Sequence, residues 1–420
     1  MGEKLYWLGF SVFSGIGPTK FRALLVNFGS AKDAWLAKKD DLRRIIGESL
    51  APKFEAFRKG FSIEGYAKAL EKKGISFLIL EDPQYPNLLK QIKNPPFVLY
   101  VKSAEVANKD FHVRSASKLH LLNPVRMPAG SHNENFVSSP HFNFDLTKTI
   151  AVVGTRRITQ YGREVTEIFT RELSAAGFTI VSGLALGVDA VAHQTAIEAG
   201  GKTIAVLGSG CDLCFPLENQ HIYNSIVAGA GCLVSEFPLG MEPTKWSFPA
   251  RNRIIAGLAE AVLVTEGAED SGSLITADYA FKNNRKVFAV PGPITSSFSQ
   301  GPYKLIQKGA KLVTRAEDIL KEFSIFPAKR DPASLDNSQF SIKSERSKIN
   351  PPVGGQSSKF QNATEEENRI LKLLENEQLN FDEIVRRSEM NSAKAGTLLT
   401  MMEIKGMIKN LESGYFKLDF

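Results

Sequence analysis

Short apolar runs alternate with helix-length amphipathic segments between residues 149 and 323. The runs are rich in Val, Ile, Leu and Ala, and most end in a turn that contains glycine or another small residue. They span residues 149–154, 178–183, 202–208, 232–236, 261–265, 286–291 and 311–313. Because continuous apolar strands that alternate with helices form parallel sheets covered on both faces, this region predicts a Rossmann-like, doubly wound α/β domain. Ligands of such sheets bind beyond the carboxyl ends of the strands.

The regions on either side of this domain have different patterns of apolar and polar residues. Residues 1–75 predict helices with short connections, and residues 76–102 contain two apolar strand-like runs separated by proline-marked turns. Residues 103–148 are rich in Ser, Asn, His and Pro without periodicity, which predicts a flexible insertion. Residues 324–363 are polar and contain proline, as linkers do. Residues 364–420 offer three helix-length segments and an alternating, hairpin-like end, which is the plan of a winged helix.

A turn near the N-terminus has two interpretations. Gly15-Ile16-Gly17-Pro18 resembles the hairpin of a helix-hairpin-helix module, whose backbone amides can contact a DNA phosphate. The same residues suit an ordinary connection between helices, with glycine for tight geometry and proline at a helix start. We favour the ordinary turn.

The bulk composition is that of an ordinary globular protein. Of 420 residues, 43% are hydrophobic and 23% are charged, a length and balance that suit two or three domains. Three cysteines provide no disulfide framework, which fits a reducing compartment. The apolar stretch at residues 5–13 is too short to span a bilayer and lacks the features of a secretory signal. We therefore expect a cytoplasmic protein without a membrane partner.

Positive charge is distributed unevenly along the chain. The formal net charge is +7 and the isoelectric point is near 9.1. Lysines and arginines outnumber acids by seven in residues 1–102, whereas residues 150–322 hold 16 basic and 17 acidic residues. A site for a polyanion in the central domain would therefore need basic residues that cluster locally.

Glycine-containing turns follow the first three strands predicted in the central domain. Glycine lets the backbone approach a ligand closely, and the amides at a helix N-terminus attract anions. A single turn of this kind is weak evidence, because strand–helix packing also needs glycine. Several at successive strand ends, with an arginine nearby, favour an anion site. The turns are Gly154-Thr155-Arg156, then Ser182-Gly183 with Gly187, and then Gly208-Ser209-Gly210.

A basic and aromatic cluster lies between the fourth and fifth predicted strands of this domain. Guanidinium groups bind phosphate oxygens and aromatic rings stack on exposed bases, so such a cluster suits a single-stranded nucleic acid. In the alternative, Phe248 lies in the core and Arg251 or Arg253 forms a structural ion pair. Further along, Ser271-Gly272-Ser273 marks a helix start that can accept an anion. The cluster reads Lys245-Trp246-Ser247-Phe248-Pro249-Ala250-Arg251-Asn252-Arg253.

Residues that suggest other chemistry have simpler explanations. Asp189 and His193 lie four apart on one helix face and suit capping and internal hydrogen bonds. Cys211 and Cys214 resemble a redox pair, but no second pair for zinc accompanies them, and a chance pair of buried thiols is favoured. The four histidines within residues 103–148 are too widely spaced for a compact metal site. Because the Walker-type loop and the serine elbow of hydrolases are also missing, we expect no catalysis, metal or cofactor.

Seven motifs, in order along the chain, resemble those of one known family. IAVVGTRRITQYG is followed by SGLALGVDAVAH, GGKTIAVLGSGCD, SEFPLG, FPARNRIIAGL, SGSLITADYA and VFAVPGPI. In this order they resemble the DNA-processing protein A family, known as DprA or Smf. The segment YPNLLKQIKNPPFVLY resembles the family's lead-in segment. The N-terminal helices resemble its SAM-like or helix-hairpin-helix domain, and residues 364–420 resemble its winged-helix domain.

The resemblance implies a bacterial, cytoplasmic protein that binds single-stranded DNA, commonly as a homodimer. It implies further that the protein loads the recombinase RecA onto that DNA in natural transformation and recombination. Within the pocket, Arg156 is the residue that would contact a phosphate. The residues that the resemblance assigns to DNA binding are Arg156, Ser182, Gly183, Gly187, Lys245, Phe248, Arg251, Asn252, Arg253, Ser271, Gly272 and Ser273.

The sequence departs from the family pattern at two places and leaves two rival functions open. The segment equivalent to residues 103–148 is usually much shorter, and Tyr303 stands where asparagine is common. One rival is a nucleotide phosphoribohydrolase of the lysine-decarboxylase-like type, but its Pro-Gly-Gly-x-Gly-Thr-x-x-Glu loop is replaced here by EDSGSLIT without the glutamate. The other rival is a scaffold in which the winged helix recruits proteins and nucleic acid is incidental.

Overall fold

The computed structural model describes most of the chain. The described residues are 2–104, 146, 148–325, 364–374, 378–388, 390–405, 407–410 and 415–418. The chain divides into two compact units, Met1–Ser334 and Leu335–Phe420. The predicted insertion and the predicted linker lie almost entirely outside the described residues. Within the described part, no helix is long and apolar enough to cross a membrane.

The N-terminal part of the larger unit consists of helices packed around aromatic side chains. The ring of Phe10 stacks on Phe54 with centroids 5.1 Å apart and meets Trp35 edge-on at 5.2 Å. Gly15 has a φ of +110°, and Pro18 occupies the first turn of its helix, as an ordinary connection between helices requires. The helices are α1 (Glu3–Val12), α2 (Pro18–Phe28), α3 (Ala31–Leu36), α4 (Lys39–Ile46), α5 (Leu50–Gly60) and α6 (Ile63–Lys72).

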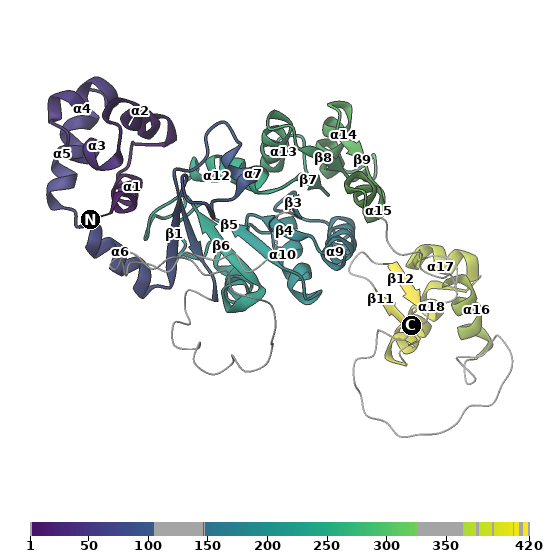
Figure 1. The fold of residues 1–420 in the computed structure, drawn as a ribbon. Coiled ribbons are helices and arrows are strands. Elements are labelled where there is room, and N and C mark those ends of the chain that lie inside the picture. Colours follow the sequence, from purple (N-terminus) through teal and green to yellow (C-terminus); the bar gives the residue numbers. More distant parts are fainter. Residues whose placement is uncertain are drawn as a thin grey trace, which may run out of the picture. The chain divides into compact units, whose positions relative to one another are not determined.

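A nine-stranded sheet forms the centre of the larger unit (Figure 1). Its order is β1-β2-β6-β5-β4-β3-β7-β8-β9, and the pairings are parallel from β6 to β9 and antiparallel for β1–β2 and β2–β6. All seven strands predicted for the central domain are present, which confirms the predicted fold class. The strands are β1 (Ile75–Ile79), β2 (Val98–Lys102), β3 (Thr149–Val153), β4 (Thr179–Ser182), β5 (Thr203–Val206), β6 (Gly231–Ser235), β7 (Ala261–Val264), β8 (Lys286–Ala289) and β9 (Lys311–Leu312).

Helices cover the parallel strands and create apolar cores on both faces of the sheet. Because successive strand residues point to opposite faces, β3 contributes Ala151 to one core and Val152 to the other. Ala151 packs in the core that contains Ile254, and Val152 in the core that contains Phe169. The helices are α7 (Asn87–Lys90), α9 (Gln160–Ala175), α10 (Val188–Glu198), α11 (Gln220–Ser225), α12 (Ser247–Leu258), α13 (Gly272–Lys282), α14 (Gln300–Gln307) and α15 (Ala316–Leu320), with short turns η1 (Leu217–Asn219), η2 (Ile226–Ala230), η3 (Ser297–Ser299) and η4 (Lys321–Phe323).

Residues 76–102, the predicted lead-in segment, join the N-terminal helices to the sheet. Its strands β1 and β2 extend the sheet beyond β6 in antiparallel fashion. Phe97, just before β2, stacks on Phe21 of α2 with centroids 4.1 Å apart. An ion pair of 2.7 Å connects Lys73, after α6, to Asp212, after β5. The sequence predicted two apolar runs here, but not that they continue the central sheet.

The smaller unit has the predicted winged-helix arrangement. Its three strands form an antiparallel sheet in the order β10-β12-β11. Ile370, Ile384, Leu399 and Phe416 meet in its core. The elements are α16 (Glu365–Leu374), β10 (Leu379–Asn380), α17 (Phe381–Ser388), α18 (Ser392–Ile404), β11 (Ile408–Asn410) and β12 (Tyr415–Leu418).

Candidate nucleic-acid interface

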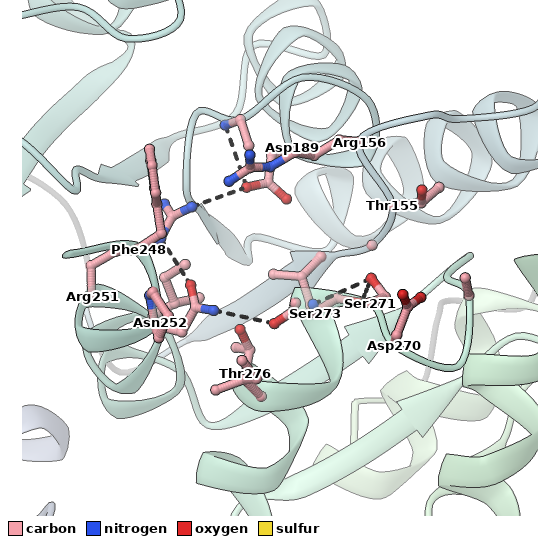
Figure 2. A pocket seen from close by; sticks show the side chains of 18 of the residues that line it. Thr155, Arg156, Asp189, Phe248, Arg251, Asn252, Asp270, Ser271, Ser273 and Thr276 are labelled. Atoms are coloured by element: carbon pink, nitrogen blue, oxygen red, sulfur yellow. Dashed lines mark hydrogen bonds and ion pairs between the residues drawn. The ribbon is translucent and has the colours of Figure 1, made fainter. Parts of the chain in front are cut away.

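A cavity of about 480 Å³ lies beyond the carboxyl ends of the parallel strands. β4 and β7 pair with opposite sides of β3, so the connections that leave the sheet diverge there and open a crevice, as at other topological switch points. The turn after β3, the first part of α12 and the turn before α13 line this crevice (Figure 2). The structure therefore brings together segments that are more than 100 residues apart in the sequence.

The side chain of Arg251, on α12, is buried and holds three connections together. It is 4% exposed. Its Nη1 donates hydrogen bonds to the carbonyl oxygens of Gly183, at 2.5 Å, and Val206, at 2.7 Å. Its Nε donates to Oδ1 of Asn252 at 2.9 Å, and the amide of Asn252 donates to the carbonyl of Gly272 at 3.2 Å. Two neighbouring residues of α12 thus fix the ends of β4 and β5 and the start of α13.

Asp189 supplies the opposite charge for Arg251. One carboxylate oxygen, Oδ2, lies 3.9 Å from Nη2 of Arg251 and accepts hydrogen bonds from the backbone amides of Gly183 and Ala185. Burial raises the pKa of Asp189, and Arg251 opposes that rise. Burial also lowers the pKa of Arg251, and Asp189 opposes that change in turn. Because an unpaired buried charge is strongly destabilising, each residue depends on the other.

His193 holds the turn after β4 through hydrogen bonds and is neutral. Its Nε2 accepts a hydrogen bond from the amide of Leu184 at 3.2 Å. Its Nδ1 donates to Oγ1 of Thr203 at 2.7 Å, because that hydroxyl already donates to the carbonyl of Ile180. Burial, reinforced by the charge of Arg251, lowers the pKa of His193 to about 3. The predicted internal hydrogen bonding of Asp189 and His193 is confirmed.

Close contacts require the glycines of this turn. Gly187 has a φ of +77°, and a Cβ there would lie 2.2 Å from the carbonyl oxygen of Thr155. A Cβ on Gly183 would lie 1.7 Å from Nη1 of Arg251. Ser182 is buried, and its hydroxyl donates to the carbonyl of Val152 at 2.7 Å. These predicted site residues therefore determine the shape of the turn. The charged side chains at the cavity come from other segments, such as the loop after β3.

The cations exposed at the cavity are Arg156, Arg157 and Lys245. None of the three has an ion pair with another residue that the structure describes. The guanidinium of Arg156 lies over the ring of Phe248, 4.9 Å from its centroid, and that of Arg157 lies 5.8 Å from the centroid of Phe298. The sequence reasoning singled out Arg156 and Lys245 but missed Arg157, although it directly follows Arg156.

Glu266 holds the loop that carries the two arginines. Its carboxylate accepts hydrogen bonds from the amide and the hydroxyl of Thr159, at 2.9 and 2.7 Å. Its backbone carbonyl accepts from the amide of Thr155 at 2.8 Å. The Thr159 hydroxyl in turn accepts from the amide of Gly162 and caps α9. The loop is therefore preformed. The sequence reasoning did not assign a role to Glu266, although it stands at the end of a predicted strand, where ligand sites are expected.

The N-terminus of α13 forms another side of the cavity. Ser271 is the N-cap: its hydroxyl accepts from the amide of Ser273 at 3.4 Å, and the two hydroxyls lie 2.8 Å apart. Gly272 is exposed between them, as the prediction of an open anion-accepting turn requires. Asp270 is also exposed at this edge, so the cavity is not uniformly positive.

Two of the predicted contact residues have internal partners instead. Arg253 is not among the residues that line the cavity, and its guanidinium forms an ion pair with the partly buried Glu236. Arg251 lines the cavity only with a side chain that is already committed to carbonyl groups and Asp189. For both arginines, the structure has the internal ion pair that was the alternative interpretation of the sequence.

Metal binding has no candidate site within the described part of the chain. No group of three or more His, Cys, Asp or Glu side chains there could hold a metal ion. Cys211 is buried, and burial raises the pKa of its thiol well above the ordinary value. The pKa of Cys214 is also raised by burial, to about 11. The four histidines of the 103–148 segment lie outside the described residues.

Comparison with known proteins agrees with this fold. Residues 140–324 match the family model described as DNA recombination-mediator protein A, and residues 357–414 match the DprA winged helix domain. Protein Smf of Synechocystis is 35% identical over 77% of this chain and 74% of the relative. The chain belongs to the DprA/Smf family.

Other DprA proteins agree with this membership. The DNA processing protein DprA of Bacillus subtilis is 39% identical over 60% of this chain and 73% of the relative. The X-ray structure of DprA from Streptococcus pneumoniae has a TM-score of 0.59 and 31% sequence identity, and the match covers 76% of this chain and 97% of that chain. The resemblance predicted from the seven motifs is therefore confirmed, and the nine-stranded sheet and winged helix are those of a DprA protein.

Removing the buried guanidinium should destabilise the larger unit. In an Arg251→Ala variant, Asp189 and two carbonyl groups remain buried without their partner, so we expect the free energy of unfolding to fall by about 3–5 kcal/mol. Urea denaturation measures this change. Arg156→Ala is the matched control, because Arg156 is exposed, and its effect should stay within about 0.5 kcal/mol. Equal stability of the two variants would contradict a structural role for Arg251.

The neutral His193 should make stability depend on pH. In the unfolded chain, His193 has its ordinary pKa of 6.5 and takes up a proton as the pH falls below that value. In the folded protein its pKa is about 3, so it stays neutral until the pH approaches 3. The folded state is therefore destabilised as the pH falls, and this residue should remove about 2 kcal/mol between pH 7 and 5. Urea titrations of the wild type and of His193→Gln, which keeps a donor and an acceptor without titrating, test this. An identical loss in both proteins would exclude His193 as its source.

Proposed function

We propose that the chain binds single-stranded DNA, with backbone phosphates in the cavity beyond the carboxyl ends of β3 and β7. One observation carries the proposal: Arg156 and Arg157 are exposed on a preformed loop and have no internal counter-charge among the described residues. Lys245 and the N-terminus of α13 face the same cavity and add favourable groups for an anion. A guanidinium so placed needs no reorganisation to take phosphate oxygens.

Aromatic rings at the cavity favour a ligand with unpaired bases, such as a single strand, and not an isolated phosphate ion. Phe248 lies beneath Arg156 and lines the cavity, so a base can stack beside the bound phosphate. Trp246, 59% exposed, stands next to Lys245 and Ser247 in the chain, at the start of α12. In this proposal Arg251 and Asn252 position the loops and do not contact the strand. We propose a binding role rather than catalysis, because the roles assigned to these residues are to position loops and to present guanidinium groups and aromatic rings to a ligand.

The finer role follows from family membership. We propose that the protein acts in the cytoplasm as a homodimer and loads RecA recombinase onto single strands, during natural transformation or other recombination. Its family model is described as a recombination mediator, which supports this assignment. The winged helix suits a protein contact better than DNA, because Lys394 and Lys405 of its α18 region are ion-paired with Glu366 and Glu367.

Removing the charge of Arg156 should weaken binding to a single strand. Arg156→Ala should lower the affinity for a labelled oligonucleotide by about 1–3 kcal/mol, and should reduce the salt dependence of binding by about one phosphate contact. Fluorescence anisotropy at two salt concentrations measures both. The matched control is Arg163→Ala on α9, which removes an exposed arginine that does not line the cavity. If the two variants bind alike, the phosphate site is elsewhere.

A role in RecA loading predicts a second defect in the same variant. RecA hydrolyses ATP when it assembles on DNA, so the ATPase rate on strands coated with single-strand-binding protein reports its loading. The wild-type protein should raise this rate, and Arg156→Ala should raise it much less at equal concentration. Light scattering should show a dimer for both proteins. Absence of any stimulation by a wild-type protein that binds DNA would remove the loading role and leave DNA binding intact.

A further inference from the structure

The loop that carries Lys245 is closed at its ends by its own residues. It spans residues 237–246 and lies between β6 and α12. The ring of Phe237 meets that of Trp246 edge-on with centroids 5.6 Å apart, and the amide of Thr244 donates to Oγ of Ser247 at 2.9 Å. These contacts bring the two ends of the loop together. The middle of the loop is held by residues from other parts of the chain.

One of these anchors comes from the N-terminal helices. Tyr66 lies on α6, and its hydroxyl accepts a hydrogen bond from the backbone amide of Leu239 at 2.8 Å. The side chain of Leu239 packs against the apolar core that contains Phe10 and Phe54. The loop is therefore fastened to the N-terminal domain through both the backbone and the side chain of one residue.

Asp212 forms a second link between the same two segments. Its Oδ1 accepts a hydrogen bond from the amide of Gly240 at 3.0 Å, and its Oδ2 lies 2.7 Å from Nζ of Lys73, which follows α6. Burial opposes the ionisation of Asp212, but hydrogen bonds from Lys73 and from the amide of Gly240 lower its pKa below the ordinary value. A charged, buried carboxylate thus bridges the N-terminal domain and the loop, at the residue next to the one that Tyr66 holds.

Binding at Lys245 benefits from these links because its own side chain is exposed. A lysine on a mobile loop must be ordered when it binds a phosphate, whereas a loop that is held in advance avoids that entropic cost. The loop also carries Pro243, which lines a cavity of about 410 Å³ that adjoins the first and shares Arg156 and Phe248 with it. The position of the loop therefore affects the walls of both cavities.

We infer that the N-terminal domain sets the position of Lys245 and thereby the affinity of the chain for single-stranded DNA. This inference rests on the proposed function and adds an element that regulates it. No described residue of the N-terminal helices lines either cavity, so the domain acts through the loop and not by contact with the strand. Tyr66 and Lys73 are positioning residues in this arrangement. Displacing α6 from the loop releases Lys245 and weakens DNA binding.

The test combines the loss of the anchors with the loss of the lysine that they position. Lys245→Ala should lower the affinity for a labelled oligothymidylate about tenfold. The double variant Tyr66→Phe/Lys73→Gln keeps Lys245 but lacks both links, and should lower the affinity about fivefold and reduce the salt dependence of binding. Added to Lys245→Ala, the two substitutions should cause no further loss, because they act through that lysine. Fluorescence anisotropy at two salt concentrations measures all four proteins.

Two further variants separate positioning from charge and from general stability. Lys4→Gln removes the same charge from another ion pair of the N-terminal helices, the 2.8 Å contact of Lys4 with Asp82, and should bind as the wild type does. Lys73→Arg keeps a cation beside Asp212 and should bind as the wild type does, unlike Lys73→Gln. Urea denaturation establishes that each variant is folded under the binding conditions, and Tyr66→Phe alone replaces the double variant if that protein does not fold.

The outcomes distinguish this inference from the proposed function. The inference is overturned if the anchor variant binds oligothymidylate normally, or if its loss of affinity is the same with and without Lys245, while Arg156→Ala remains defective. Normal binding by Lys245→Ala beside a defective Arg156→Ala overturns it as well. If Arg156→Ala and Lys245→Ala both bind normally, the phosphate site and the proposed function fall with it.

Discussion

A buried positive charge organises this end of the molecule. In place of water, the guanidinium of Arg251 has two carbonyl groups and a carboxylate as partners. These partners lie just after β4, at the end of β5 and in the first turn of α10. Displacing any of these connections would leave a charge or a carbonyl without a partner in a medium of low dielectric. The glycine at position 183 follows from the same constraint, because the guanidinium occupies the space of a Cβ. The rigid turns come from this network.

The four arginines of this region fall into two groups, those with internal partners and those exposed at the cavity. Arg251 and Arg253 are each paired with a carboxylate inside the protein, so they add little to the field outside it. Arg156 and Arg157 lie on a loop that Glu266 fastens, and their charges remain available to solvent. A domain with nearly balanced charge can therefore present a locally positive cavity.

The sequence predicted the central fold well because apolar runs and amphipathic helices each have a definite period. It did not predict that β1 and β2 continue the sheet, because strand partners distant in sequence leave no local signal. It also grouped Arg251 with Arg156, since composition does not distinguish a buried arginine from an exposed one. A signal was nonetheless present: Arg251, Ile254, Ile255 and Leu258 recur at helical spacing, which places the arginine on the buried face of α12.

The direction of the strands decides where the long segment between β2 and β3 is attached. β2 runs antiparallel to β6 and ends with Lys102 opposite Leu233, so the chain leaves β2 in the direction of the amino end of β6. Thr149 begins β3 at the amino end of the parallel strands. Both attachment points therefore lie at the rim opposite the cavities, separated from them by the length of the strands, about 15 Å. Evolution can lengthen or shorten this connection without disturbing the loops that hold the arginines. The same rim offers a place where a tag or a fluorescent label can be inserted far from the cavity that holds the arginines.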